Sequence, residues 1–179
     1  MYDIVLADPP WPYFGSTDKN AAAGKHYDLM TIEDIKNVEH QGNKTSACFM
    51  WATGPKLDLA VETMKAWDYH YRGVAFVWVK TRQDGEIIHA QGVPPTATKP
   101  TTEFVLLGTS CKRGRPFPLL SSRVPQVILA PRGAHSAKPS IIRDHIISLY
   151  GDRSRVELFA REEVDGWVAR GLETSGEKL

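Results

Sequence analysis

Six short runs of near-continuous apolar sequence constrain the fold of this chain more than any other feature. Strands of this kind, rich in Val, Ile, Phe and Trp, are typical of a sheet that is covered on both faces. The runs span Tyr2–Ala7, Ala47–Ala52, Val74–Lys80, Glu103–Gly108, Gln126–Ala130 and Val156–Ala160. Helical patterns lie between some of them, so the sequence predicts a three-layer α/β sandwich whose sheet is rich in parallel pairs.

Local signals place three helices between these runs. Thr31 can cap a helix because Asp34 follows three residues later, as in a capping box. Apolar residues recur at helical spacing over Leu57–Trp67. Pro139 suits the first turn of a third helix, whose apolar stripe covers Ile142–Leu149.

Length and composition favour one soluble domain. The 179 residues and 20.0 kDa suit a single domain, which we expect over residues 1–173 with a frayed tail at 174–179. No apolar run approaches the roughly 20 residues of a membrane span, and the first residues carry an acid and no basic leader. We therefore expect no membrane association and a cytoplasmic location. The two cysteines are isolated and the six histidines are scattered, so neither a zinc site nor a disulfide framework is expected.

The net charge of +1 conceals an uneven distribution. Residues 80–161 carry a net charge of +7, whereas 1–79 and 162–179 carry −3 each. Within the basic part, residues 112–132 contain five cations, Arg113 and Arg115 among them, and no acid. Two interpretations stay open: a solvated surface, or a patch that faces the phosphates of a nucleic acid.

Three long segments carry neither strand nor helix patterns. They cover residues 12–30, 81–102 and 109–125, and each follows the end of a predicted strand. Ligands of open α/β sheets bind at the carboxyl ends of the strands, and long loops in a compact domain are usually functional. We therefore expect all three segments to border the functional crevice.

The tetrapeptide Asp8-Pro9-Pro10-Trp11 directly follows the first strand. Two prolines fix φ and remove backbone donors, which leaves the Asp8 carboxylate and free proline carbonyls as acceptors beside Trp11 and Tyr13. This rim suits a planar ring that bears an NH₂ group, such as adenine. Asp8 and the Pro9 carbonyl can accept both amine hydrogens, which frees the nitrogen lone pair for attack, while a stacked aromatic ring contributes roughly 1–3 kcal/mol. The structural alternative is a proline turn with a capping Asp and a packed Trp.

This motif belongs to a series of segments that, in this order, resembles a known family. The segments are ADPPW, HY at 26–27, FMWATGP, VAFVWVKT, TEFVLLGT, PRGAHSAKP and ELFAR. Over roughly residues 2–173 they resemble the S-adenosylmethionine-dependent N(6)-adenine methyltransferases of the DPPW type. The resemblance implies a Rossmann-like sheet in permuted order, with the catalytic motif near the N-terminus and the cofactor strand near the C-terminus. It implies S-adenosylmethionine as the cofactor, and no metal.

The resemblance also implies roles for individual residues. Asp8 would bind both the target amine and the cofactor's ammonium group, and Lys138 the cofactor's carboxylate. The catalytic set is Asp8, Pro9, Pro10 and Trp11, and the substrate-facing set is Tyr13, Tyr27 and Glu103, with Arg113 and Arg115 added from the charge pattern. The cofactor set is Asp8, Ser136, Lys138, Phe159, Ala160, Arg161, Glu163 and Glu173.

One departure bears on the cofactor site. The family often places a His after its ELFxR strand and an Asn later, where this chain has Glu162-Glu163 and Leu172. This leaves open a weaker cofactor site, or a homodimer or partner subunit that completes it. The compact size resembles bacterial and phage members, so we expect methyl transfer to the 6-amino group of adenine in DNA. RNA adenosine as the substrate, and a catalytically silent nucleic-acid-binding subunit of a heterodimer, are the alternatives.

Overall fold

The computed structural model describes residues 1–12, 30–89, 98–133 and 137–171. Their strands form one mixed sheet in the order β5-β3-β4-β2-β1-β6-β7. The strands are β1 (Tyr2–Ala7), β2 (Gly42–Thr53), β3 (His70–Thr81), β4 (Thr102–Thr109), β5 (Val127–Pro131), β6 (Arg155–Leu158) and β7 (Val168–Arg170). The helices are α1 (Ile32–Asn37), α2 (Leu57–Ala66) and α3 (Ile141–Tyr150), and a 3₁₀ turn, η1 (Gly54–Lys56), precedes α2.

All six expected strands are present, which confirms an α/β fold. The sequence missed the short strand β7 and extended β6 too far, because the chain leaves the sheet after Leu158. The capping box of α1 is confirmed: Asp34 N donates to Thr31 Oγ1 over 3.1 Å, and Thr31 N donates to Asp34 Oδ2 over 3.0 Å. The expected start of α3 was early, since Ser140 is its N-cap and Pro139 precedes the first turn.

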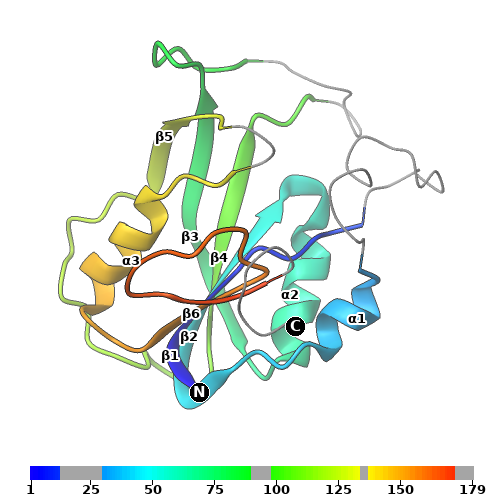
Figure 1. Cartoon of the computed structure of the whole chain (residues 1–179), viewed down its shortest axis with the longest axis vertical. Helices are drawn as coiled ribbons and strands as arrows, with labels where there is room; N and C mark the ends of the chain where they lie inside the picture. The colour runs from blue at the N-terminus through cyan, green and yellow to red at the C-terminus, as the bar shows by residue number, and fades with distance from the viewer. Residues whose placement is uncertain (13–29, 90–97, 134–136, 172–179) are drawn as a thin grey trace.

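Helices cover both faces of the sheet, as Figure 1 shows with α3 on one side and α1 and α2 on the other. Alternation along β1 explains this arrangement, because successive side chains point to opposite faces. Ile4 and Leu6 belong to the core cluster on the α3 face, while Val5 and Ala7 belong to the cluster on the α1/α2 face. A sheet with two buried faces requires near-continuous apolar strands, which is the pattern in the sequence.

Strand β4 is the antiparallel member of the sheet. It runs opposite to both β2 and β3, whereas β1 is parallel to β2 and to β6. The start of β4, at Glu103, therefore lies at the edge where β1, β2 and β3 end. The segment that follows β4 leaves from the opposite edge, so the expectation that 109–125 borders the same crevice as 81–102 is wrong. The sequence pattern of a buried strand carries no information about its direction.

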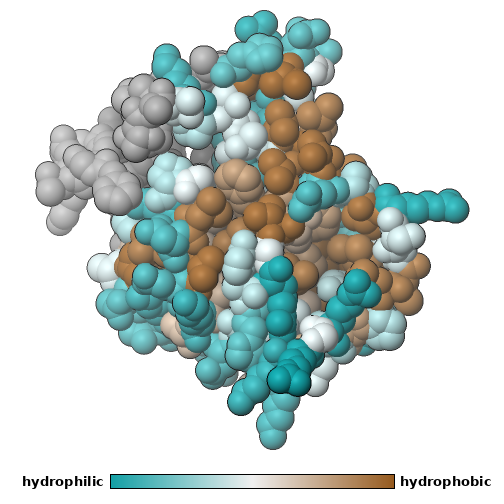
Figure 2. All heavy atoms as spheres, turned by 180° about the vertical axis from the view of Figure 1, so that it is seen from behind, coloured by the Kyte–Doolittle hydropathy of each residue, from teal (hydrophilic) through white to brown (hydrophobic). Residues whose placement is uncertain are grey.

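The outer strand β5 leaves part of the sheet uncovered. Val127 and Leu129 are 54% and 61% exposed, while Ile128 between them is buried in the α3-side core. Figure 2 views the molecule from the side opposite to Figure 1 and shows hydrophobic side chains gathered over the upper centre of that face. No helix in the described part of the chain is long and apolar enough to cross a membrane.

The C-terminal end of the described chain packs directly on the turn that follows β6. Ala160 N donates to Arg170 O over 3.1 Å, and the backbone of Ala160 approaches Gly171 closely. A Cβ at position 171 would lie 1.9 Å from Ala160 O, a contact that real Cβ atoms do not make. Glycine at this position therefore allows β7 to dock beside β6.

We predict that Gly171→Ala destabilises the protein, because the backbone of β7 or of the turn after β6 must shift. The expected loss is about 1–3 kcal/mol, the usual cost of forcing an extra methyl group into a packed site. Urea unfolding measures it. Gly54→Ala is the matched control, since a Cβ there would meet its nearest neighbour at 3.9 Å. Equal stability of the two variants would contradict the tight packing of Gly171.

Candidate active site

Four charged residues lie at one edge of the sheet on its α3 face. Alternation places them there: Asp8 continues the parity of Leu6, and Lys80 continues that of Trp78, both residues of the α3-side core. Glu103 likewise shares a face with Val105 of β4. Glu157 of β6 alternates with the α1/α2-side residues on either side of it, so it also points toward α3.

A chain of alternating charges links these strands to the residues before α3. Lys138 Nζ lies 2.8 Å from Asp8 Oδ2 and 3.5 Å from Glu103 Oε2. Lys80 Nζ lies 2.6 Å from Glu103 Oε1. The side chains of Asp8 and Lys138 are only 16% and 18% exposed, so each charge is neutralised where water reaches it poorly.

Two tryptophan rings lie beside the ammonium groups of this chain. Lys138 Nζ lies 5.5 Å from the centre of the Trp51 ring, and Lys80 Nζ lies 5.1 Å from that of Trp78. The two indoles contact each other edge to face, with ring centres 6.1 Å apart. The negative faces of the two rings attract the neighbouring ammonium groups.

The environment of Lys138 keeps it protonated. Burial favours the neutral amine, but attraction by Asp8 and then by Glu103 outweighs burial, so the pKa of Lys138 lies above its ordinary value. A fixed ammonium beside a fixed carboxylate can bind the two ends of an amino-acid group: its carboxylate at Lys138 and its ammonium at Asp8. Among the described residues, no group of three or more His, Cys, Asp or Glu side chains could hold a metal ion.

The proline turn is less open than the sequence indicated. The Pro9 carbonyl is not free, because Trp11 N donates to it over 2.8 Å. A carbonyl oxygen has two lone pairs, so Pro9 can still accept a second hydrogen. Trp11 itself packs against the α1/α2-side core, and its Nε1 donates to Trp51 O over 2.9 Å. The indole of Trp11 therefore helps to fix the turn after β1 against strand β2.

Arg143 of α3 forms a second ionic contact at the same edge. Its Nε and Nη2 donate to the two carboxylate oxygens of Glu157 over 2.7 and 3.0 Å, and its Nη1 donates to Glu162 over 3.0 Å. Burial raises the pKa of the Glu157 carboxyl; Arg143 opposes this shift, while the charges of Asp8 and Glu162 add to it. Arg143 thus joins α3 to both ends of the turn that follows β6.

That turn carries the backbone strain of the site. Phe159 has a φ of 61°, in the left-handed region that non-glycine residues rarely adopt. Its ring is buried in the α1/α2-side core, and the preceding carbonyl, Leu158 O, accepts from Asp8 N over 3.3 Å. The turn is therefore held by a packed ring on one side and by the Asp8 backbone on the other.

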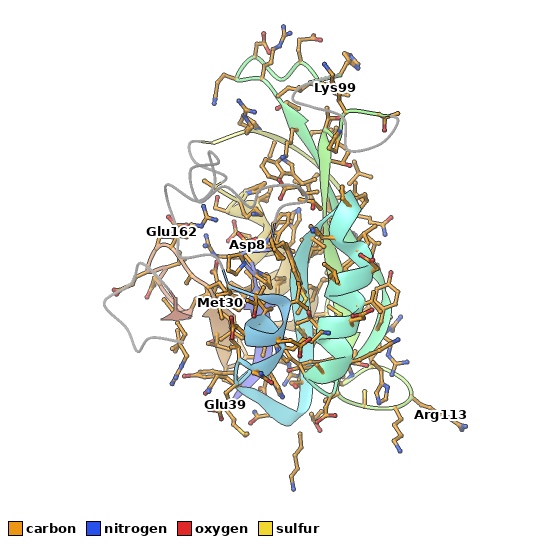
Figure 3. All side chains as sticks on the ribbon, turned by 90° about the vertical axis from the view of Figure 1, so that its right-hand side faces the viewer. Asp8, Met30, Glu39, Lys99, Arg113 and Glu162 are labelled. Carbon is orange, nitrogen blue, oxygen red and sulfur yellow. The ribbon has the colours of Figure 1, made fainter. Side chains whose placement is uncertain are left out.

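The structure brings together part of the expected site. Asp8, Glu103 and Lys138 are in contact, and the turn Phe159–Arg161 lies next to Asp8 in the sheet. Glu163 is exposed. Arg113 and Arg115 are not brought to Asp8, because they follow β4 at the opposite edge, as Figure 3 shows for Arg113. The remaining expected residues, Tyr13, Tyr27, Ser136 and Glu173, lie outside the described residues.

The sequence analysis missed three charged residues of this edge, Lys80, Arg143 and Glu157. Glu157 had a usable signal, since a lone acid within an apolar strand must find a cation when it is buried. Lys80 had a weaker one, as the last residue of the expected strand. Arg143 had none, because an arginine on a helix is usually a solvated residue.

Comparison with known proteins finds similarity to methyltransferases over nearly the whole chain. Residues 2–173 match the model of the MT-A70 family. A Type II methyltransferase, M.MunI, from Mycoplasma sp is 31% identical over 198 aligned residues, which cover 99% of this chain and 80% of that protein. An N(6)-adenosine-methyltransferase MT-A70-like protein from Drosophila melanogaster is 28% identical over 99% of this chain, but the match covers 28% of that protein. The human catalytic subunit METTL3 is also 28% identical, over 98% of this chain and 28% of its own length.

We predict that Arg143→Met lowers the free energy of unfolding by about 3–5 kcal/mol at pH 7, because Glu157 then stays buried without its cation. In the variant, the folded-state pKa of Glu157 rises further above its unfolded value. The folded variant is therefore penalised at neutral pH, and the loss shrinks as the pH falls toward that unfolded value. Urea unfolding at pH 5 and pH 7 measures this.

The double variant Arg143→Met with Glu157→Gln is the control, since it removes the unpaired charge. It is expected to recover much of the stability at pH 7. A loss that does not change with pH, and that Glu157→Gln does not relieve, would mean that the ion pair contributes little.

Proposed function

Because the chain belongs to the MT-A70 family of methyltransferases, we propose that it transfers a methyl group from S-adenosylmethionine to the exocyclic 6-amino group of adenine in DNA. The observation that carries this proposal is the contact between Asp8 and Lys138 over 2.8 Å at the carboxyl edge of the sheet. The tetrapeptide's carboxylate and the lysine of the HSAKP segment are 130 residues apart in sequence, yet they meet in one site.

The residues present fit this cofactor. Its amino-acid end carries an ammonium and a carboxylate, and Asp8 and Lys138 are the complementary pair of charges. The turn Phe159–Arg161 runs beside Asp8 and would offer backbone groups to the nucleoside part, since the Phe159 ring is occupied by the core. When bound, S-adenosylmethionine supplies an electrophilic methyl group on a sulfonium.

The amine of adenine is a poor nucleophile because its lone pair is delocalised into the ring. Asp8 and the Pro9 carbonyl are two acceptors on a turn that two prolines and the Trp11 contacts make stiff. Accepting both amine hydrogens draws the nitrogen toward tetrahedral geometry and frees the lone pair. Holding that nitrogen in one place then supplies much of the rate acceleration through positioning.

The proposal includes the permuted order of the fold. Strand β1, which ends at the catalytic tetrapeptide, is first in the sequence, and β6, which leads to the proposed cofactor turn, comes near its end. The two strands are nevertheless parallel neighbours, with Ala7 paired to Leu158. Segments far apart in the chain thus contribute to one site.

The higher identity to the Type II methyltransferase supports DNA over RNA as the proposed substrate. The Type II methyltransferase is 31% identical over 99% of this chain, and the human adenosine methyltransferase subunit is 28% identical over 98% of it. RNA adenosine as the substrate is the second candidate, and a silent subunit that binds nucleic acid is the third. The silent subunit is disfavoured by the presence of Asp8, Trp11 and Lys138 together.

The decisive experiment is incubation with isotopically labelled S-adenosylmethionine and unmethylated DNA, or RNA of the same sequence, followed by mass analysis of the nucleosides. We predict labelled N(6)-methyldeoxyadenosine, and a rate at least about 100-fold lower for Asp8→Ala, because an electrostatic contact to the reacting group is lost. Circular dichroism checks that the variant folds. Asp144→Ala, an exposed acid on α3, is the matched control. Full turnover by Asp8→Ala would refute the assignment.

Calorimetry separates the enzyme from a silent subunit. We predict that the wild type binds S-adenosylmethionine and that Lys138→Met binds it about 10- to 100-fold more weakly, the usual worth of a hydrogen bond to a charged group. Lys65→Met, on the exposed side of α2, is the control for charge removal. A wild-type chain that takes up no cofactor would favour the silent-subunit hypothesis.

A further inference from the structure

We propose that this protein contacts nucleic acid a second time, at the edge of the sheet opposite Asp8. The contact surface consists of Arg72, Lys112, Arg113, Arg115 and Arg123, which we call the basic edge. This proposal rests on the proposed function, since it assigns a second surface to the same substrate. The active site does not use these residues.

The antiparallel direction of β4 separates the two surfaces. Glu103, near the start of β4, contacts Lys138 of the active site, whereas Thr109 at the other end accepts from Arg72 Nε over 2.7 Å. Strand β4 has 8 residues, and at about 3.4 Å per residue it is about 27 Å long. Figure 3 shows Asp8 and Arg113 well apart in the same view.

The segment that carries the cations is firmly anchored. Ser46 N donates to Ser110 Oγ over 2.8 Å, and Leu120 N donates to Leu149 O over 2.9 Å. Phe117 is buried in the α3-side core, where its ring lies 3.9 Å from the Arg153 guanidinium carbon. A backbone held in this way loses little conformational entropy on binding, so the positions from which its cations extend are set in advance.

The cations of this segment lack acidic partners within the described part of the chain. Lys112, Arg113, Arg115 and Arg123 are exposed, and none of them forms an ion pair there. By contrast, Lys80, Lys138 and Arg143 at the active site are each neutralised by carboxylates. Repulsion among fixed, unpaired cations is relieved by an external anion, and nucleic acid offers a regular row of phosphates.

A groove lies within the basic edge. It has a volume of about 360 Å³, near the low end of the roughly 300–1,000 Å³ found for ligand pockets. Leu107, Val124 and Leu149 give it apolar walls, and Arg72 and Arg115 border it. Apolar walls with guanidinium groups beside them suit a nucleoside with its adjoining phosphates, because arginine donates to phosphate through two parallel N–H groups.

The separation of the two surfaces sets a minimum substrate length. Double-stranded DNA rises about 3.4 Å per base pair, so about eight base pairs are needed to cover the length of β4. A duplex that extends fewer base pairs beyond the target adenine reaches only the Asp8 edge. Affinity should therefore rise with length, and arginines of the basic edge should cause the increase.

The test is the affinity of the full chain for fluorescent DNA duplexes with strands of 6 and 30 nucleotides, measured by anisotropy over a range of salt concentrations. We expect Arg113→Ala/Arg115→Ala to bind the long duplex several-fold more weakly, with a salt slope lower by about 1 for each lost phosphate contact. Binding of the short duplex should not change. Arg113→Lys/Arg115→Lys, which keeps the charge, should retain most of the slope, and Lys65→Ala controls for charge removal elsewhere.

An unchanged slope, an equal loss on both duplexes, or an equal loss in Lys65→Ala would overturn the proposal. An unchanged slope together with lost binding of polyglutamate would assign the basic edge to an acidic protein instead. The assay does not depend on turnover. If the chain methylates neither DNA nor RNA but its affinity still rises with DNA length as expected, the proposed function is refuted and the second contact at the basic edge is supported.

Discussion

The ion pair between Asp8 and Lys138 is the constraint on which the rest of this site depends. A carboxylate at the end of a buried strand must be neutralised, and the cation comes from a segment 130 residues further along the chain. Once Lys138 is held there, α3 begins three residues later over the strand ends, and Arg143 reaches Glu157. The helix, four strands and the turn after β6 are thereby joined through charges that water screens poorly.

The same network provides chemistry as well as stability. Asp8 and Lys138 neutralise each other, and each is also complementary to one end of a zwitterionic ligand. A bound ligand would therefore replace the contact between Asp8 and Lys138 with its own ammonium and carboxylate, and both side chains would keep a partner of opposite charge. Glu103 keeps Lys80 as its partner in either case. The indole faces of Trp51 and Trp78 add a second favourable contact to each lysine beside its carboxylate partner.

The direction of β4 gives the two edges of the sheet different charged groups. The antiparallel β4 begins at the edge that carries Asp8, and the cationic segment after Thr109 leaves from the other edge. The charges around Asp8 are thus balanced by ion pairs, while the exposed cations that follow β4 lie at the other edge. Under the proposed function, this arrangement would separate methyl transfer, which requires a defined local field, from attraction of the nucleic-acid backbone, which requires only excess positive charge.

Local features of the sequence determined the strands, the capped start of α1 and the Asp8–Trp11 turn, because each depends on neighbouring residues and on burial of apolar side chains. Asp8 could be named as a candidate from its own motif, and Lys138 only from the resemblance of its segment to a known family. The direction of β4, the pairing of β7 with β6, and the contacts of Arg143 with Glu157 were decided only by the tertiary structure. A buried strand has the same apolar pattern in either direction, and a charged side chain does not indicate which distant residue will neutralise it, so both depend on how the whole chain packs.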